Sequence, residues 1–251
     1  MKLVILGSGT GVPVKARGCA GLYVRIGGER VLLDAGPGTL RQLVRLGVTY
    51  LDLDRIFLTH FHPDHCLDPV SVLFAMRIPR PPRTKPLVVH GPRGLRQLYR
   101  RLNTAFHGWI APRTYRLAFK ELARRPSELR LGGYTVRTAP MRHSPGALGY
   151  RLEHRGRVVA YSGDTDVCEG IVRLGRGADL LVLECSMTDE RKVPGHLTPT
   201  ECGRIAAQAG CRHLVLTHFY PVFKGYDIPC RVRRAFRGKL SLARDLAKFS
   251  I

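Results

Sequence analysis

A dense run of imidazole and carboxylate side chains stands at residues 60–65 of this 251-residue chain. The run reads His60-Phe61-His62-Pro63-Asp64-His65. Neutral imidazole and carboxylate are the ligands that zinc and related divalent ions prefer. In an extended or loop segment His60 and His62 point the same way, whereas Asp64 and His65 can turn toward a second ion. Because so many polar groups make poor core material, we interpret the run as a metal-binding site rather than a solvated loop.

Three further candidate ligands follow later predicted strands. His143 comes after Tyr134–Pro140, Asp164 stands between Ser162 and Thr165 after another strand, and His218 follows Thr217. Each of them alone would more often be a loop residue or a satisfied core residue. Together they supply the extra ligands that two ions need, including a carboxylate able to bridge. The spacing therefore predicts a site for two metal ions.

Short apolar runs that alternate with helical patterns must position these residues. We expect strands at Lys2–Leu6, Gly21–Ile26, Arg30–Asp34, Arg55–Thr59, Leu87–His90, Tyr134–Ala139, Leu148–Glu153, Val158–Ser162, Asp179–Glu184 and His213–Thr217, and helices at Gly38–Leu46, Leu67–Met76, Gly94–Ala105 and Pro199–Ala209. Thr198 and Glu201 have the spacing of a capping box for the last helix. The segment Phe106–Arg130 receives no assignment. Strands mixed with helices throughout favour a layered α/β fold, and we expect one domain over residues 1–251.

The composition narrows the class of partner and the setting. The formal net charge is +22, which favours polyanionic partners such as nucleic acid, although the basic residues are spread along the whole chain. No apolar run approaches the roughly 18–20 residues of a membrane helix, so no membrane association is expected. The seven cysteines are scattered and never spaced as C-x-x-C. A reducing cytoplasm is the simplest setting for such a chain.

The pattern His-x-His-x-Asp-His, followed by a distant His, an Asp and a last His, resembles the metallo-β-lactamase superfamily. The resemblance covers nearly the whole chain. It implies an α/β fold, a four-layer αβ/βα sandwich with mixed sheets and a di-metal site at one edge. By this resemblance His60, His62 and His143 hold one ion, Asp64, His65 and His218 hold the other, and Asp164 bridges them. The intact His62 favours Zn²⁺ over iron, with Mn²⁺ as the alternative metal.

Other residues resemble the ribonuclease Z branch, whose members are tRNA 3′-end endonucleases. The run from Leu6 to Arg17 and the run Leu33-Asp34-Ala35-Gly36-Pro37-Gly38-Thr39 look like the opening of that family. Asp34 is expected to be a structural hydrogen-bonding residue. Gly195-His196-Leu197-Thr198 resembles the family's additional histidine motif, and Glu184 matches a glutamate before it. The resemblance implies that Asp64 orients the attacking hydroxide. It also implies that His196 stabilises phosphoryl charge or protonates the leaving oxygen, while Glu184 holds the His196 ring.

Several features decide between reactions. Asp164 stands where true β-lactamases of this fold carry cysteine, which disfavours antibiotic hydrolysis. Gly18 replaces the asparagine that usually follows Lys-x-Arg in ribonuclease Z, and Gly94–Gly133 is too short for the family's tRNA-gripping arm. We therefore expect a metal-dependent phosphodiesterase acting on RNA or a small phosphodiester, with the family habit of a homodimer. One alternative is hydrolysis of a thioester, lactone or sulfate ester. Another is a nucleic-acid-binding protein with structural zinc, which the absence of cysteine ligands disfavours.

Overall fold

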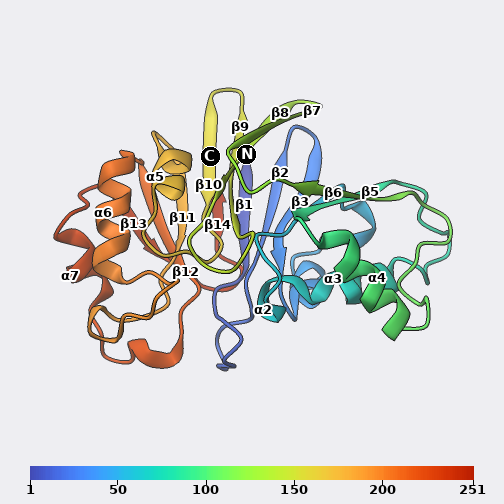
Figure 1. Ribbon diagram of the computed structural model, residues 1–251, viewed down its shortest axis with the longest axis horizontal. Helices are drawn as coiled ribbons and strands as arrows, with labels where there is room; N and C mark the ends of the chain where they lie inside the picture. The colour runs from blue at the N-terminus through green and yellow to red at the C-terminus, as the bar shows by residue number, and fades with distance from the viewer.

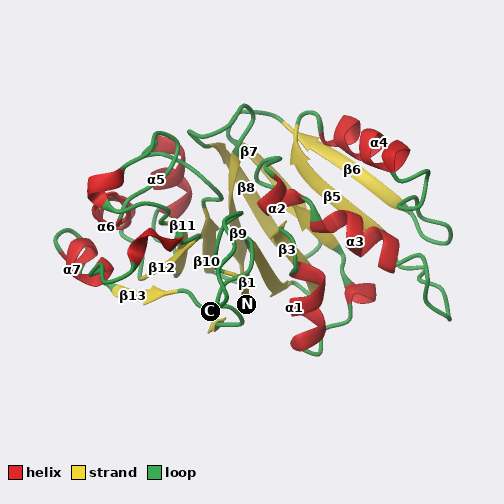
Figure 2. Cartoon of the chain, turned by 90° about the horizontal axis from the view of Figure 1, so that it is seen from below, coloured by secondary structure: helices red, strands yellow, loops and turns green.

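The computed structural model describes residues 1–251 and shows two seven-stranded sheets packed face to face, with helices on both outer sides (Figure 1, Figure 2). The predicted four-layer αβ/βα sandwich with mixed sheets is thereby confirmed. The two chain ends lie side by side in both views. The Met1 ammonium donates a hydrogen bond to the Ile251 carbonyl oxygen at 2.8 Å.

Each sheet combines parallel and antiparallel pairs. The first has the order β14-β1-β2-β3-β4-β5-β6, with β1 (Lys2–Gly7), β2 (Gly21–Ile26), β3 (Glu29–Ala35), β4 (Arg55–Phe57), β5 (Leu87–Pro92), β6 (Leu117–Leu122) and β14 (Lys248–Ser250). The second has the order β13-β12-β11-β10-β9-β8-β7, with β7 (Ser127–Leu131), β8 (Tyr134–Pro140), β9 (Leu148–His154), β10 (Arg157–Tyr161), β11 (Leu180–Glu184), β12 (His213–Thr217) and β13 (Lys239–Leu242). Strands β3 to β6 run parallel to one another in the first sheet, and strands β10 to β13 do so in the second.

Two groups of helices cover the outer faces. The helices are α1 (Thr39–Arg45), α2 (Pro63–Cys66), α3 (Asp68–Ala75) and α4 (Leu95–Ala105) beside the first sheet, and α5 (Glu169–Gly175), α6 (Pro199–Ala209) and α7 (Ile228–Arg233) beside the second, with short 3₁₀ turns at Tyr50–Asp52, Asp189–Arg191 and Pro221–Phe223. The predicted capping box between Thr198 and Glu201 is present at the start of α6. Gly210 ends that helix at φ 61°, a conformation that glycine adopts without a steric penalty.

Apolar side chains fill three layers between the four layers of backbone. The central layer joins the two sheets through residues such as Phe57 and Tyr150, whose rings meet edge to face at 5.3 Å. The outer layers pack the helices on the sheets. Burial of each such side chain contributes roughly 1.5–3 kcal/mol. Polar bonds also cross the central layer, because Tyr150 donates to the Leu58 carbonyl at 2.6 Å and the Leu148 amide donates to the Thr59 carbonyl at 3.0 Å.

The carboxyl ends of the central strands meet along one edge of the sandwich. Strands β8, β10, β11 and β12 run in the same direction in the second sheet, as β3, β4 and β5 do in the first. The predicted strand Arg55–Thr59 ends at Phe57. Thr59 instead begins the loop to α2, where its side chain serves the site described below. The loops at this edge therefore project from both sheets toward one another.

Candidate metal centre

The structure brings all nine predicted site residues together at this edge. His60, His62, Asp64 and His65 lie in the loop after β4 and in α2, His143 follows β8, Asp164 follows β10, Glu184 ends β11, His196 precedes α6 and His218 follows β12. His218 holds a left-handed backbone at φ 60°. Such a conformation is uncommon for a residue other than glycine and clusters at functional sites.

One group of ligand atoms combines three histidines with one oxygen of Asp164. His143 Nε2 lies 3.1 Å from His62 Nδ1. Asp164 Oδ2 lies 3.8 Å from His60 Nε2 and 3.7 Å from His143 Nε2. The Nδ1 atoms of His60 and His143 are occupied, because His60 Nδ1 contacts Thr59 Oγ1 at 2.9 Å and His143 Nδ1 contacts the Gly195 carbonyl at 2.9 Å. The Nε2 atoms of His60 and His143 are therefore free to point at a shared centre.

A second group faces the other oxygen of Asp164. His65 Nε2 and His218 Nε2 lie 3.1 Å apart, and Asp64 Oδ2 lies 3.4 Å from His218 Nε2. Asp164 Oδ1 is 3.2 Å from His65 Nε2 and 3.5 Å from His218 Nε2. The ligand atoms of each group lie within 4.8 Å of one another. Asp164 thus presents one oxygen to each group, which is the arrangement of a bridging carboxylate.

Unpaired buried atoms show that this centre fits cations. His60 Nε2 and Asp164 Oδ1 are buried and accept or donate no hydrogen bond. Burial and the neighbouring His65 lower the pKa of His60 to about 2, so its ring is neutral and ready to act as a ligand. Burial by itself raises the pKa of Asp164. The neighbouring His218 and His65 outweigh that effect and hold the pKa of its carboxyl well below the usual range. Imidazole nitrogens gathered around a buried carboxylate are a donor set for divalent metal ions, so the residues of this centre fit such ions.

Asp34 anchors the centre from below. This fully buried residue of β3 accepts hydrogen bonds from the Thr59 amide at 2.7 Å, the Thr59 hydroxyl at 2.9 Å and the Tyr161 hydroxyl at 2.9 Å. It also accepts from His65 Nδ1 at 2.8 Å, which leaves His65 Nε2 facing the second ligand group. Apart from His65, Asp34 forms no hydrogen bond or ion pair with any of the candidate metal ligands. The predicted structural role of Asp34 agrees with this geometry.

Glu184 organises the opposite side. Its Oε1 accepts from His196 Nδ1 at 3.0 Å and from the Thr165 amide at 2.9 Å. Its Oε2 accepts from the Ser186 hydroxyl at 2.5 Å, and Ser186 Oγ contacts His218 Nδ1 at 3.0 Å. Burial lowers the pKa of His196, but the hydrogen bond that its ring donates to Glu184 and the charge of that carboxylate raise the pKa above its ordinary value. One carboxylate therefore orients His196 directly and His218 through Ser186.

Three residues of this arrangement escaped the sequence analysis. Thr59, Tyr161 and Ser186 all form hydrogen bonds to the carboxylates that hold the histidines. Only Thr59 carried a usable signal, since it directly precedes the ligand run. Tyr161 and Asp34 lie 127 positions apart in the sequence, so no local pattern links them. A single serine such as Ser186 likewise has no neighbours at a spacing that would indicate a role.

Comparison with known proteins identifies the class first. A family profile described as "Beta-lactamase superfamily domain" matches residues 29–219. The solved structure of human tRNase Z, short form (ELAC1), superposes with a TM-score of 0.82 at 25% identity, covering 100% of this chain and 99% of that one. The metallo-β-lactamase fold protein YhfI of Bacillus subtilis superposes equally well, with a TM-score of 0.82 at 24% identity and coverage of 99% and 98%. The chain therefore belongs to the metallo-β-lactamase superfamily, as its motif predicted.

Full-length relatives then narrow the class to one family. The ribonuclease Z of Streptomyces coelicolor is 33% identical over 301 aligned positions, covering 100% of this chain and 97% of the relative. The ribonuclease Z of Streptomyces avermitilis is 31% identical with the same coverage. Within the superfamily, this chain is a member of the ribonuclease Z family.

These findings confirm the expected reaction class. The chain is a metal-dependent hydrolase, a phosphodiesterase that resembles ribonuclease Z. Its fold and its ligand cluster support divalent metal binding. None of its helices combines the length and the apolar character needed to span a bilayer.

Proposed function

We propose that this chain is a two-zinc endoribonuclease that cleaves a phosphodiester bond of precursor tRNA. The observation that carries the proposal is Asp164, whose two oxygens face two separate groups of ligand atoms. The proposed zinc ligands are His60, His62, Asp64, His65, His143, Asp164 and His218. The tRNA substrate is inferred from the names of the relatives and from the net charge of +22.

The zinc ions would supply Lewis-acid stabilisation of the phosphoryl group and a nucleophile derived from water at neutral pH. The chain's own residues would position the reaction. Asp64 is held by the Gly11 amide, which donates to its Oδ2 at 2.9 Å, and it would orient the attacking hydroxide by accepting a hydrogen bond from it. His62 would present Nδ1, and the other four metal-binding histidines would present Nε2, because their second nitrogens already have partners.

His196 and Glu184 would act on the leaving group. The raised pKa of His196 favours a protonated ring that can stabilise phosphoryl charge or give a proton to the departing oxygen. His196 lies beside the centre, with its ring centroid 4.9 Å from that of His143. Glu184 is a positioning residue, since its contact is with His196 Nδ1 and not with the reacting atoms.

His196→Ala should therefore lower kcat on RNA by roughly 10²–10⁴-fold, the usual contribution of general acid–base catalysis. On bis(p-nitrophenyl) phosphate the same variant should retain most of its activity, because p-nitrophenolate leaves without protonation. Glu184→Gln should show the same contrast with a smaller loss. Steady-state kinetics of both variants on both substrates would measure these losses of kcat. Equal losses on both substrates would exclude the leaving-group role.

Metal removal tests the proposed function itself. Dialysis against a chelator should abolish hydrolysis of bis(p-nitrophenyl) phosphate and of a 3′-extended precursor tRNA, and two equivalents of Zn²⁺ should restore both activities. The RNA products should map to one position. Panels of thioester, lactone and sulfate ester substrates give the control for the alternative hydrolase reaction. Chelator-resistant activity, or turnover of those esters alone, would contradict the proposal. Salt-sensitive RNA binding without turnover would favour a binding protein.

We also propose that residues 1–251 form one domain in a homodimer. The continuous central core supports the first part, because it draws residues from both sheets. The exposed Phe74, Phe106 and Trp109 line an apolar groove of about 550 Å³, a kind of surface that often marks association. Sedimentation equilibrium should give twice the chain mass, and unfolding should be one cooperative transition. A concentration-independent monomer would contradict the dimer.

A cytoplasmic setting is proposed as well. Its support is that all seven cysteines are free, with Cys66, Cys185, Cys202 and Cys211 buried. Chains of this kind belong to reducing compartments. Fractionation followed by thiol labelling should find the protein in the cytoplasm with seven reactive thiols after denaturation. Native disulfide bonds would contradict this setting.

A further inference from the structure

A loop between β11 and α6 carries His196, the residue proposed to act on the leaving oxygen. The Ser186 amide donates to the Leu197 carbonyl oxygen at 3.1 Å and closes the loop at its base. Of residues 187–196, which lie beyond that base, only Thr188 is buried. Polar contacts rather than apolar packing therefore fix the position of His196.

Three of these contacts belong to the ammonium group of Lys192, in the same loop. Its Nζ donates to Asp166 Oδ1 at 2.7 Å, to Glu201 Oε2 at 2.6 Å and to the His196 carbonyl oxygen at 2.5 Å. These three bonds use every donor that an ammonium group has. The two carboxylates come from different elements, because Asp166 follows β10 and Glu201 lies in the first turn of α6. Lys192 thus joins the backbone at His196 to two other parts of the fold.

The same two carboxylates bind the backbone on either side of His196. Asp166 Oδ2 accepts from the Gly195 amide at 3.0 Å, and Glu201 Oε2 accepts from the Thr198 amide at 2.9 Å. Because both carboxylates lie within 2.7 Å of one ammonium nitrogen, they would repel each other without that cation. The ammonium group therefore lets both anions hold this backbone, which is fixed before, at and after the histidine.

The backbone held in this way also reaches the metal centre. The Gly195 carbonyl oxygen contacts His143 Nδ1 at 2.9 Å. The ring of His196 donates from Nδ1 to Glu184 Oε1 at 3.0 Å, which leaves Nε2 without a partner in the chain. Two separate groups therefore orient His196, because Glu184 holds its ring and Lys192 holds its backbone.

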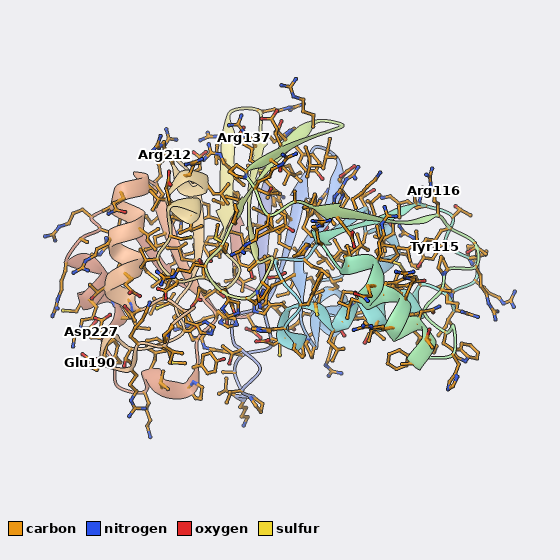
Figure 3. All side chains as sticks on the ribbon, viewed as in Figure 1. Tyr115, Arg116, Arg137, Glu190, Arg212 and Asp227 are labelled. Carbon is orange, nitrogen blue, oxygen red and sulfur yellow. The ribbon has the colours of Figure 1, made fainter.

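An ion pair at the outer end of the same loop offers a comparison. Glu190 lies at the outline of the molecule (Figure 3), where its carboxylate accepts from Arg231 Nη2 at 2.9 Å. Arg231 also pairs with Asp189 at 3.8 Å. The side chains of Lys192 and Arg231 are 29% and 30% exposed, so solvent screens the two cations to a similar degree. Only Lys192 contacts the backbone around His196.

We propose that Lys192 is a positioning residue for His196, because it fixes the backbone from which the His196 ring reaches the leaving oxygen. The inference rests on the proposed cleavage of RNA. Lys192 contacts none of the candidate metal ligands, so its effect on the reaction passes through His196. Displacement of a reacting group by about 1 Å can cost roughly 100-fold in rate. Loss of Lys192 should therefore impair leaving-group chemistry and spare metal binding.

Lys192→Met removes the ammonium group and keeps most of the side-chain length. It should lower kcat on 3′-extended precursor tRNA by roughly 10–100-fold with little change in KM. Hydrolysis of bis(p-nitrophenyl) phosphate and the metal content should not change, and both show that the variant folds. Lys192→Arg should recover part of the lost kcat, because a guanidinium group keeps the charge and bonds well to carboxylates. Arg231→Met is the matched control and should leave both activities unchanged.

A double variant separates positioning from general damage to the loop. If Lys192 acts through His196, then Lys192→Met should lower kcat on RNA no further when His196→Ala is already present. A further loss in the double variant would overturn the inference. So would equal losses on both substrates in Lys192→Met, or an equal loss on RNA in Arg231→Met.

Amide hydrogen exchange gives a readout that needs no substrate. The Gly195 and Thr198 amides should exchange faster in Lys192→Met and at the ordinary rate in Arg231→Met. Unchanged exchange, or an unchanged kcat on RNA, in Lys192→Met would overturn the inference and leave the proposed function standing. An unmodified protein that does not cleave RNA would instead refute the proposed function, and exchange alone would then decide whether Lys192 holds the loop.

Discussion

Asp164→Ala should lower kcat on bis(p-nitrophenyl) phosphate by roughly a thousandfold, because a metal ion supplies several kcal/mol of transition-state stabilisation and about 1.36 kcal/mol is tenfold in rate. Asp164 is the residue whose oxygens face both ligand groups, at 3.7–3.8 Å on one side and 3.2–3.5 Å on the other. Alanine would leave no carboxylate shared between the two groups of imidazoles, because Asp64 lies beside the second group alone. Metal analysis of the purified variant should show a loss of at least one ion.

Asp166→Asn is the matched control for this prediction. Asp166 stands two residues away in the same loop, but its carboxylate accepts from Lys192 Nζ and the Gly195 amide and faces no ligand nitrogen. This control should keep its metal content and most of its activity. A full complement of metal in Asp164→Ala, with normal kcat, would show that Asp164 is not a bridging ligand.

The proposed metal ligands could be singled out from the sequence because their signals are local. Four of them occupy six consecutive positions, and His143, Asp164 and His218 each follow a strand whose apolar residues are easily recognised. Parallel strands bring their carboxyl ends to one edge, so residues distant in sequence meet there. Glu184 and His196 were found only through the family resemblance. Their 3.0 Å contact has no signature in composition or spacing.

The strands that escaped prediction lie at or near the sheet edges. β13 and β14 are short, and β6 and β7 fall in the segment without an assignment. β6 has a single buried residue, Leu122, and β7 alternates between exposed and half-buried positions. An edge strand packs fewer apolar side chains, so its pattern carries little information about pairing. Pairing of β14 with β1 also joins the two ends of the chain, which no local pattern encodes.

Asp34→Ala should lower the free energy of unfolding by about 3–5 kcal/mol, the cost of breaking a buried charged network by removal of one partner. The Thr59 amide and hydroxyl, the Tyr161 hydroxyl and His65 Nδ1 would all lose their acceptor in a site with no access to water. Alanine would also have to adopt φ 57°, which disfavours residues with a Cβ. Urea unfolding should show a lower midpoint with an unchanged slope.

Asp34→Asn separates the effect of losing the charge from the effect of backbone strain, because asparagine adopts the left-handed conformation readily and keeps one acceptor oxygen. The free energy of unfolding of Asp34→Asn should be closer to that of the unmodified protein than the value for Asp34→Ala is. Its metal affinity should nevertheless fall by roughly 10–100-fold, the usual effect of losing the partner of a ligating histidine. If both variants bind metal and unfold as the unmodified protein does, then Asp34 does not hold His65 in place. A loss of metal affinity in Asp34→Asn, together with a large loss of stability in Asp34→Ala alone, would show that this buried carboxylate both stabilises the sandwich and directs His65 toward the proposed metal site.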